Sequence, residues 1–144
     1  MLLKSNKEVA AEIKALFIRW RRILGLQSWR IFLAIRETTP AGEEPERASC
    51  EALSEYSEAT IGYTLDRLNG TNLNELTAHE MVHCLTHPLE SVADEYAKKH
   101  PDAAEWARRE TERTVTSIAD VLVALVKQYD DLMDKYTALK AKEK

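Results

Sequence analysis

Two histidines and a glutamate lie close together in the segment LTAHEMVHCLTHPLE, residues 76–90. His79, Glu80 and His83 form the pattern H-E-x-x-H. On a helix, residues four positions apart lie one above the other, so both imidazoles can reach one metal ion while Glu80 lies near the same face. Two neutral imidazoles are typical ligands of Zn²⁺, and the adjacent carboxylate can activate water. The segment therefore predicts a zinc site with hydrolytic chemistry.

The helix that carries this motif is apolar on most of its surface. On a helical wheel its histidines and Glu80 share one sector, and apolar residues spread around the rest: Leu73, Met81, Val82, Cys84 and Leu85. Such a helix is buried, and its polar sector needs partners. A buried helix with histidines hydrogen-bonded to carboxylates or water is the alternative interpretation, but the full pattern on a capped helix favours zinc.

A third protein ligand has to come from elsewhere in the chain. The metzincin pattern requires a glycine and a further histidine after the motif, and Thr86 and Leu89 occupy those positions. His87 continues the four-residue series but lies about 12 Å along the axis from His79, too far to share the same ion. His87 is therefore interpreted as a rim residue or simply as surface polarity.

Glutamates of the predicted C-terminal helix are the remaining candidates for the third ligand. Glu112 lies at the edge of the apolar stripe that begins at Val115, where a side chain can turn inward. Glu110 projects away from that stripe, and Glu105 is better placed as the capping partner of Asp102. The alternative for Glu112 is an exposed carboxylate paired with an arginine three or four residues back. We expect Glu112 to be the ligand, with Glu110 as the main competitor.

The elements that must position these residues follow from periodicity and turn signals. A four-and-three spacing of apolar residues predicts an amphipathic helix over about 7–24, ended by Gly25. Short runs rich in β-branched and aromatic residues predict three strands of a small, largely antiparallel sheet at 29–37, 48–56 and 58–66. Asn72, with Glu75 as its capping-box partner, opens the motif helix, and Pro88 is expected to end it. A polar connection then leads to Asp102, a second plausible cap.

The C-terminal helix has a long and regular apolar repeat. Steps of three and four run from Val115 to Leu139, about four heptads. A helix of roughly 38 residues is about 57 Å long, more than the width of a domain of this size. Unless it kinks, it packs on the N-terminal helix or on a second subunit, and a homodimer through this helix is one expectation. Residues 139–144 are expected to form a disordered tail.

Bulk composition narrows the function classes. The 144 residues predict one domain spanning 1–144, with 44% hydrophobic and 31% charged residues. A formal net charge of -4 argues against a nucleic-acid partner. No run approaches the roughly 20 apolar residues of a membrane span, and the charged N-terminus is unlike a secretory signal, so the expected location is the cytoplasm. Cys50 and Cys84 are expected to be reduced packing residues.

Four segments resemble small gluzincin-like zinc metallopeptidases, the minigluzincins, of a kind often encoded by bacteriophages and prophages. They are the lead-in LGLQSWRIFLAI, the strand EATIGYTLD, the motif helix NELTAHEMVHCLTHPLE and the segment ETERTVTSIADVL. The resemblance implies an α+β fold: an N-terminal helix, a small sheet, the H-E-x-x-H helix and a long glutamate helix. It also implies Zn²⁺ held by His79, His83 and Glu112, with Glu80 as the catalytic base, acting on a peptide or protein in the host cytoplasm.

Two further expectations concern how such a site would work. An extended peptide would add to an edge of the sheet, with the strand EATIGYTLD as the expected edge. The sequence offers five possible donors to a tetrahedral oxyanion and singles out none of them: Tyr56, Tyr63, Tyr96, His87 and His100. The competing interpretation is a non-catalytic protein in which zinc staples two helices and the C-terminal helix binds a partner or a second copy.

Overall fold

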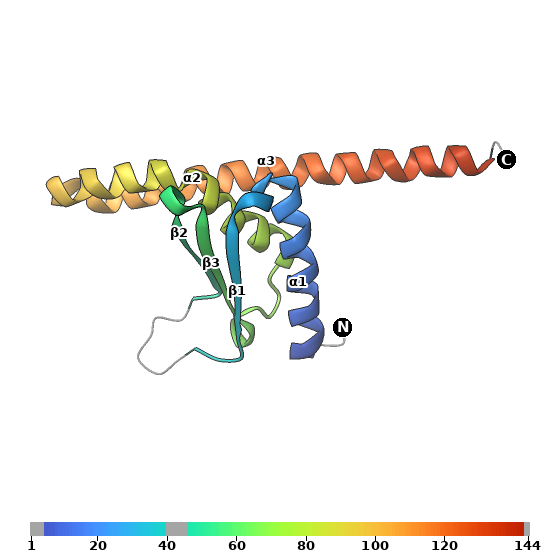
Figure 1. Cartoon of the computed structure of the whole chain (residues 1–144), viewed down its shortest axis with the longest axis horizontal. Coiled ribbons are helices and arrows are strands. Elements are labelled where there is room, and N and C mark those ends of the chain that lie inside the picture. The colour runs from blue at the N-terminus through green and yellow to red at the C-terminus, as the bar shows by residue number, and fades with distance from the viewer. Residues whose placement is uncertain (1–4, 40–45, 143–144) are drawn as a thin grey trace.

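A computed structural model of the chain describes residues 5–39 and 46–142 (Figure 1). Within them lie three α-helices, a three-stranded sheet and short 3-10 turns. The elements in chain order are α1 (Asn6–Ile23), β1 (Arg30–Arg36), β2 (Ala48–Leu53), β3 (Glu58–Thr64), α2 (Leu73–Lys99) and α3 (Pro101–Lys142). The predicted α+β class is confirmed, and no helix of the described part is both long and apolar enough to cross a membrane.

Helix α1 forms where the periodicity predicted it and packs against α2. The Ser5 side chain caps its first turn in a capping box with Glu8. Gly25 follows the helix with a φ of 69°, a left-handed conformation that glycine adopts without strain. Trp20 is fully buried, and its indole Nε1 donates to Asn74 Oδ1 at 3.0 Å. This contact fixes α1 beside the first turn of the motif helix.

The sheet is mixed, with strand order β1-β3-β2. β1 pairs with β3 in parallel and β2 pairs with β3 antiparallel, so the expectation of a largely antiparallel sheet is wrong. The strand predicted at 58–66 is confirmed as β3, and Ala59, Ile61 and Tyr63 are buried on one of its faces. This most deeply buried strand occupies the centre of the sheet. Strand order depends on such long-range burial, which the pattern of a single strand does not reveal.

The segment EATIGYTLD is therefore not an edge strand, which corrects the expectation that a peptide would add to it. The central β3 has a hydrogen-bonded neighbour on both sides, and the edge strand next to α2 is β2. One contact from β2 and one from the turn that follows it link this edge of the sheet to α2. Cys50 Sγ lies 3.7 Å from Cys84 Sγ, and Ser54 Oγ lies 3.0 Å from His87 Nδ1.

Helix α2 continues through Pro88 instead of ending there, so this expectation is also wrong. The segment predicted to be a polar connection is helical up to Lys99. A proline inside a helix removes one backbone donor and costs about 3 kcal/mol. Packing offsets this cost, because α2 lies against α3, β2 and α1. In the second half of α2, Ala93 and Ala97 are partly buried. Their small side chains let α2 and α3 approach closely.

Helix α3 is 42 residues long and starts two residues earlier than a cap at Asp102 would place it. Pro101 is its first residue, a position that tolerates proline, so Asp102 lies in the first turn and is not the cap. The helix also includes residues 139–142, which replaces most of the expected tail; residues 143–144 lie outside the described part. Leucine, alanine and lysine in this segment are strong helix formers. The C-terminal part of α3 projects beyond α1 (Figure 1).

The cap of α2 gives a first stability test. Asn72 Oδ1 accepts hydrogen bonds from the backbone N–H groups of Asn74 and Glu75, at 3.1 and 3.3 Å. We expect Asn72→Ala to lower the free energy of unfolding by about 1 kcal/mol, because those donors lose their acceptor. Asn69→Ala, the same substitution at an exposed position before the helix, serves as the control. Urea unfolding measures both, and equal effects would contradict the assigned cap.

Candidate metal centre

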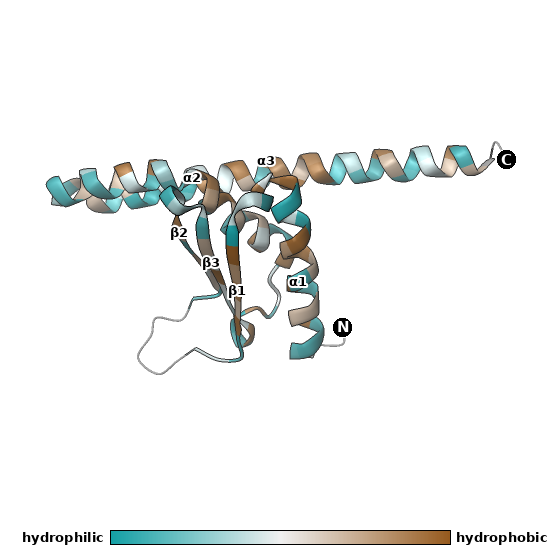
Figure 2. Cartoon of the chain, viewed as in Figure 1, coloured by the Kyte–Doolittle hydropathy of each residue, from teal (hydrophilic) through white to brown (hydrophobic). Residues whose placement is uncertain are grey.

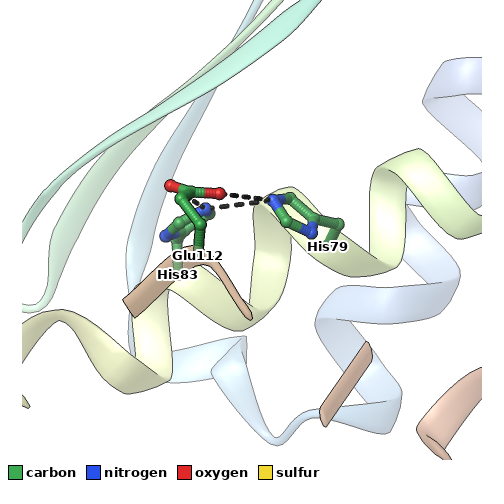
Figure 3. A group of neighbouring side chains, drawn as sticks. All are labelled: His79, His83 and Glu112. Carbon is green, nitrogen blue, oxygen red and sulfur yellow. Dashed lines mark hydrogen bonds and ion pairs between the residues drawn. The ribbon is translucent and has the colours of Figure 1, made fainter. Parts of the chain in front are cut away.

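Three side chains from α2 and α3 meet at one point (Figure 3). His79 and His83 lie one turn apart on α2, with their Nε2 atoms 3.2 Å apart. Glu112 approaches from α3, with Oε2 3.5 Å from His79 Nε2 and Oε1 3.8 Å from His83 Nε2. The structure thus brings together the three residues that the sequence nominated as metal ligands. Two imidazole nitrogens and one carboxylate face a common centre.

The spacing of these donors fits a tetrahedral metal ion. Zinc binds imidazole nitrogen at about 2.0–2.1 Å and carboxylate oxygen at about 2.0–2.2 Å, so two corners of its tetrahedron lie roughly 3.3–3.5 Å apart. The observed separations of 3.2, 3.5 and 3.8 Å bracket this value. A hydrogen bond between the two histidines would also place their nitrogens close together. A hydrogen bond between the histidines would not by itself explain why the Glu112 carboxylate, from another helix, lies within 3.8 Å of both nitrogens.

Glu90 sets the tautomer of His83. Its Oε1 lies 2.9 Å from His83 Nδ1, and the Thr86 hydroxyl donates to the same oxygen. Desolvation alone would lower the pKa of His83, but the hydrogen bond with Glu90 raises it. Burial would likewise raise the pKa of Glu90, and the bonds from His83 and Thr86 hold it low instead. A carboxylate that accepts from Nδ1–H favours the tautomer in which Nε2 can bind a metal, and it raises the basicity of that nitrogen.

His79 is held in a similar way by a weaker partner. The Thr116 hydroxyl of α3 lies 3.5 Å from His79 Nδ1. Desolvation and the neighbouring His83 both lower the pKa of His79. A lowered pKa favours the neutral imidazole, the form that binds metal.

Glu80 lies next to this group but is not part of it. Its side chain is buried, with 6% of the residue exposed, and desolvation raises its pKa to about 7. The carboxyl is close enough to interact electrostatically with His83 and Glu112. No hydrogen bond to it forms within residues 5–39 and 46–142. A buried carboxyl with a pKa near neutrality suits the transfer of protons in both directions.

The other glutamates considered as third ligands point elsewhere. Glu110 pairs with Arg113 at 3.8 Å, and Glu105 pairs with Arg108 at 3.2 Å. Neither belongs to the metal-ligating group found among the described residues, whereas Glu112 does. The Glu112 side chain is 52% exposed, so one flank of the centre is open to solvent.

The residues considered as oxyanion donors are not gathered at the centre. The Tyr63 hydroxyl is buried and donates to Thr77 at 3.1 Å, and desolvation raises the pKa of this phenol. His87 binds Ser54, as expected of a residue outside the ligand set. Tyr96 and His100 stack on each other at the far end of α2, with ring centroids 4.4 Å apart.

Sequence reasoning missed Glu90. On a helix, a residue seven positions after His83 returns to the same face two turns later, so the spacing was visible in the sequence. The helix was expected to end at Pro88, and this assigned Glu90 to a loop. Glu90 was therefore missed because the helix was predicted to end at Pro88. Its seven-residue spacing from His83 would otherwise have placed it on the same face.

The role of Glu90 is testable through metal affinity. We expect Glu90→Ala to weaken zinc binding about 10- to 100-fold, because His83 loses the acceptor that orients its ring. Glu90→Gln should recover part of this loss, since its amide oxygen still accepts from Nδ1–H. Glu95→Ala, an exposed glutamate on the same helix that pairs with Lys98, is the control. Competition with a chromophoric chelator measures all four proteins, and unchanged affinity in Glu90→Ala would contradict this role.

Two features of the chain itself are compatible with a bound metal ion: the spacing of the three donors and the carboxylate hydrogen-bonded to one of the imidazoles. Comparisons of the chain with known protein families, with characterised proteins and with solved structures found no match.

Proposed function

We propose that the protein is a zinc-dependent metallopeptidase of the gluzincin type. In this proposal His79, His83 and Glu112 hold Zn²⁺, and Glu80 is the general base. The observation that carries it is the convergence of those three donors beside a buried carboxyl whose pKa is about 7. A ligand set of two histidines and one glutamate leaves the fourth position of zinc open for water. Catalytic zinc sites have such an open position, whereas structural zinc sites have four protein ligands.

Zinc in such a site acts as a Lewis acid that makes water more acidic and polarises a carbonyl. The chain supplies proton transfer and positioning. Glu80 takes a proton from the attacking water, whose oxygen adds to the peptide carbonyl carbon. When the C–N bond breaks, the same proton passes to the leaving nitrogen, which departs as an amine. The products are a carboxylic acid and an amine, and Glu80 returns to its starting form.

The edge strand β2 is the proposed docking site for the peptide. Its only partner strand among the described residues is β3, so its other edge offers backbone N–H and C=O groups. β2 also packs on α2, with Cys50 beside Cys84, and Ser54 in the turn after β2 lies beside His87. A peptide added as a further strand would be held mainly by backbone hydrogen bonds, and it would lie along the helix that carries His79 and His83. This mode of binding favours unfolded or extended substrates with little sequence selectivity.

Hydrolysis of an unfolded protein tests this proposal. We expect the zinc-loaded protein to release short peptides from a reduced, fluorescently labelled casein, and a chelator to stop the release until zinc is restored. Fragments identified by mass spectrometry should carry new carboxyl and amino ends. A protein that demonstrably holds zinc but cleaves neither this substrate nor a random peptide library would contradict the peptidase.

A metal staple is the second candidate function, because the three proposed ligands join α2 to α3. In that case zinc would stabilise the helix pair without hydrolysis, and the protein would act by binding a partner. Zinc bound without any cleavage by the unsubstituted protein favours this candidate over the peptidase.

A further inference from the structure

One face of α3 carries large apolar side chains that the described part of the chain leaves uncovered. Brown segments recur along the C-terminal part of this helix, including the part that projects past α1 (Figure 2). The residues concerned are between 38% and 64% exposed: Ile118, Val121, Leu125, Leu132, Tyr136 and Leu139. We call them the α3 stripe. A row of apolar side chains of this length is unusual on a monomer and marks an interaction surface.

The α3 stripe is distinct from the face that α3 buries in its own domain. Val115 and Ala119 are buried there, and Leu122 and Val126 pack against the same core. Apolar positions nevertheless continue at alternating steps of three and four as far as Leu139, long after the domain core has ended. A strict seven-residue repeat keeps one seam facing a partner helix in a left-handed pair. The repeat therefore indicates that the occupant of the stripe is another helix.

The two halves of the stripe have different surroundings. Beside the first half, α1 and α3 enclose a groove of about 600 Å³, lined on the α1 side by Ile18 and Ile23 and on the α3 side by Leu125 and Tyr129. Ile18 is 60% exposed within it. Asp130 still pairs with Arg19 of α1 across this groove, and the second half of the stripe, after Asp130, lies on the part of α3 that projects past α1 (Figure 1). One half offers a groove, and the other is a free apolar helix.

We propose that two copies of the chain associate through α3, antiparallel, around a two-fold axis near residues 130–131. The projecting segment of each copy then lies in the groove between α1 and α3 of the other. The lengths match, because residues 131–142 and 119–130 each span about 18 Å. Self-complementary use of the same surface on both copies is the usual form of a two-fold interface.

Charge favours this orientation over a parallel pair. A parallel pair would place Lys135 beside Lys140 of the second copy, because these residues flank the seam at positions that face each other across such pairs. The antiparallel arrangement instead keeps Lys135 and Lys140 of the two copies apart. It also separates the two domain bodies to opposite ends of the helix pair.

The area available is sufficient for a stable dimer. Each copy contributes the α3 stripe and the exposed side chains of Ile18, Ile23 and Tyr129. At roughly 80–100 Å² for each of these nine side chains, the pair would bury on the order of 1,400–1,800 Å² in total, within the usual range of specific interfaces. The stripe lies on the side of α3 opposite Glu112, so the dimer leaves the metal centre open.

Sedimentation velocity on the full chain tests the proposal. We expect a dimer at micromolar concentration, a monomer for Leu132→Glu and a dimer for Ala138→Glu, a control that adds the same charge to the same projecting segment off the stripe. Circular dichroism and zinc content should be unchanged in both variants, since neither site touches the domain core or Glu112. A monomeric unsubstituted chain, a dimeric Leu132→Glu or a monomeric Ala138→Glu would overturn the proposal.

Cysteine cross-linking tests the orientation. Under oxidising conditions Leu132→Cys, near the two-fold axis, is expected to form a covalent dimer, and Leu139→Cys, far from its counterpart, is not. The unsubstituted chain, with its native Cys50 and Cys84, provides the background level. Cross-linking of both variants would indicate a parallel pair and overturn the antiparallel arrangement. A dimer in which neither variant cross-links would also overturn it.

Discussion

Glu80→Gln is expected to remove peptide hydrolysis while leaving zinc bound. Glutamine fits the same buried space but cannot take a proton from water, so we expect turnover to fall at least 10²- to 10⁴-fold, the usual contribution of a general base. Zinc should stay because Glu80 is not among the three convergent donors. Stability should not suffer, since a neutral side chain is easier to bury than a carboxylate. Kinetics on a fluorogenic peptide, with metal analysis of the same samples, measures both effects.

Glu75→Gln is the matched control for this experiment. Glu75 lies on the same helix in the first turn and is exposed. The same chemical change there should alter neither turnover nor zinc content. Full activity in Glu80→Gln would exclude Glu80 as the base. Loss of zinc in Glu80→Gln would instead indicate that its carboxyl takes part in holding the metal.

Glu112→Ala is expected to abolish stable zinc binding. Removal of one of three protein ligands should weaken affinity by more than the roughly 10- to 100-fold typical of residues that only orient a ligand. Because zinc would bridge α2 and α3, its binding adds to folding stability. At a free zinc concentration about 1,000 times Kd the added stability is about 4 kcal/mol. We therefore expect zinc to raise the melting temperature of the unsubstituted protein and to leave that of Glu112→Ala unchanged.

Glu110→Ala separates this effect from a general loss of charge on α3. Glu110 is two residues away, faces Arg113 and does not join the group of donors. Its substitution should preserve both zinc content and the zinc-dependent rise in melting temperature. The reverse result, with zinc retained in Glu112→Ala and lost in Glu110→Ala, would show that the wrong glutamate has been assigned.

The sequence was most informative where function depends on spacing within one helix. The four-residue separation of His79 and His83 determines that both imidazoles share a face, whatever the rest of the fold does. Glu112 was accessible for a similar reason, because it lies at the edge of the helix face that carries Val115 and Ala119, where its side chain can turn toward the core. These inferences needed only helical periodicity, and the structure brings the three side chains together.

Features that depend on contacts between distant segments were not accessible in the same way. Strand order is decided by which strand buries most area, so β3 was mistaken for an edge. Pro88 is unfavourable in a helix by local rules, and packing of α2 against α3 overrides those rules. That single error also concealed Glu90, the carboxylate that orients His83.

X-ray absorption at the zinc edge tests the zinc centre most directly. The protein, purified with zinc and freed of loosely bound metal, is predicted to hold one zinc per chain, with two imidazoles and other ligands that are all oxygen or nitrogen at about 2.0–2.2 Å. A chain that retains no zinc would contradict the account. So would a sulfur ligand near 2.3 Å, which would place the metal at Cys50 and Cys84 and not between His79, His83 and Glu112.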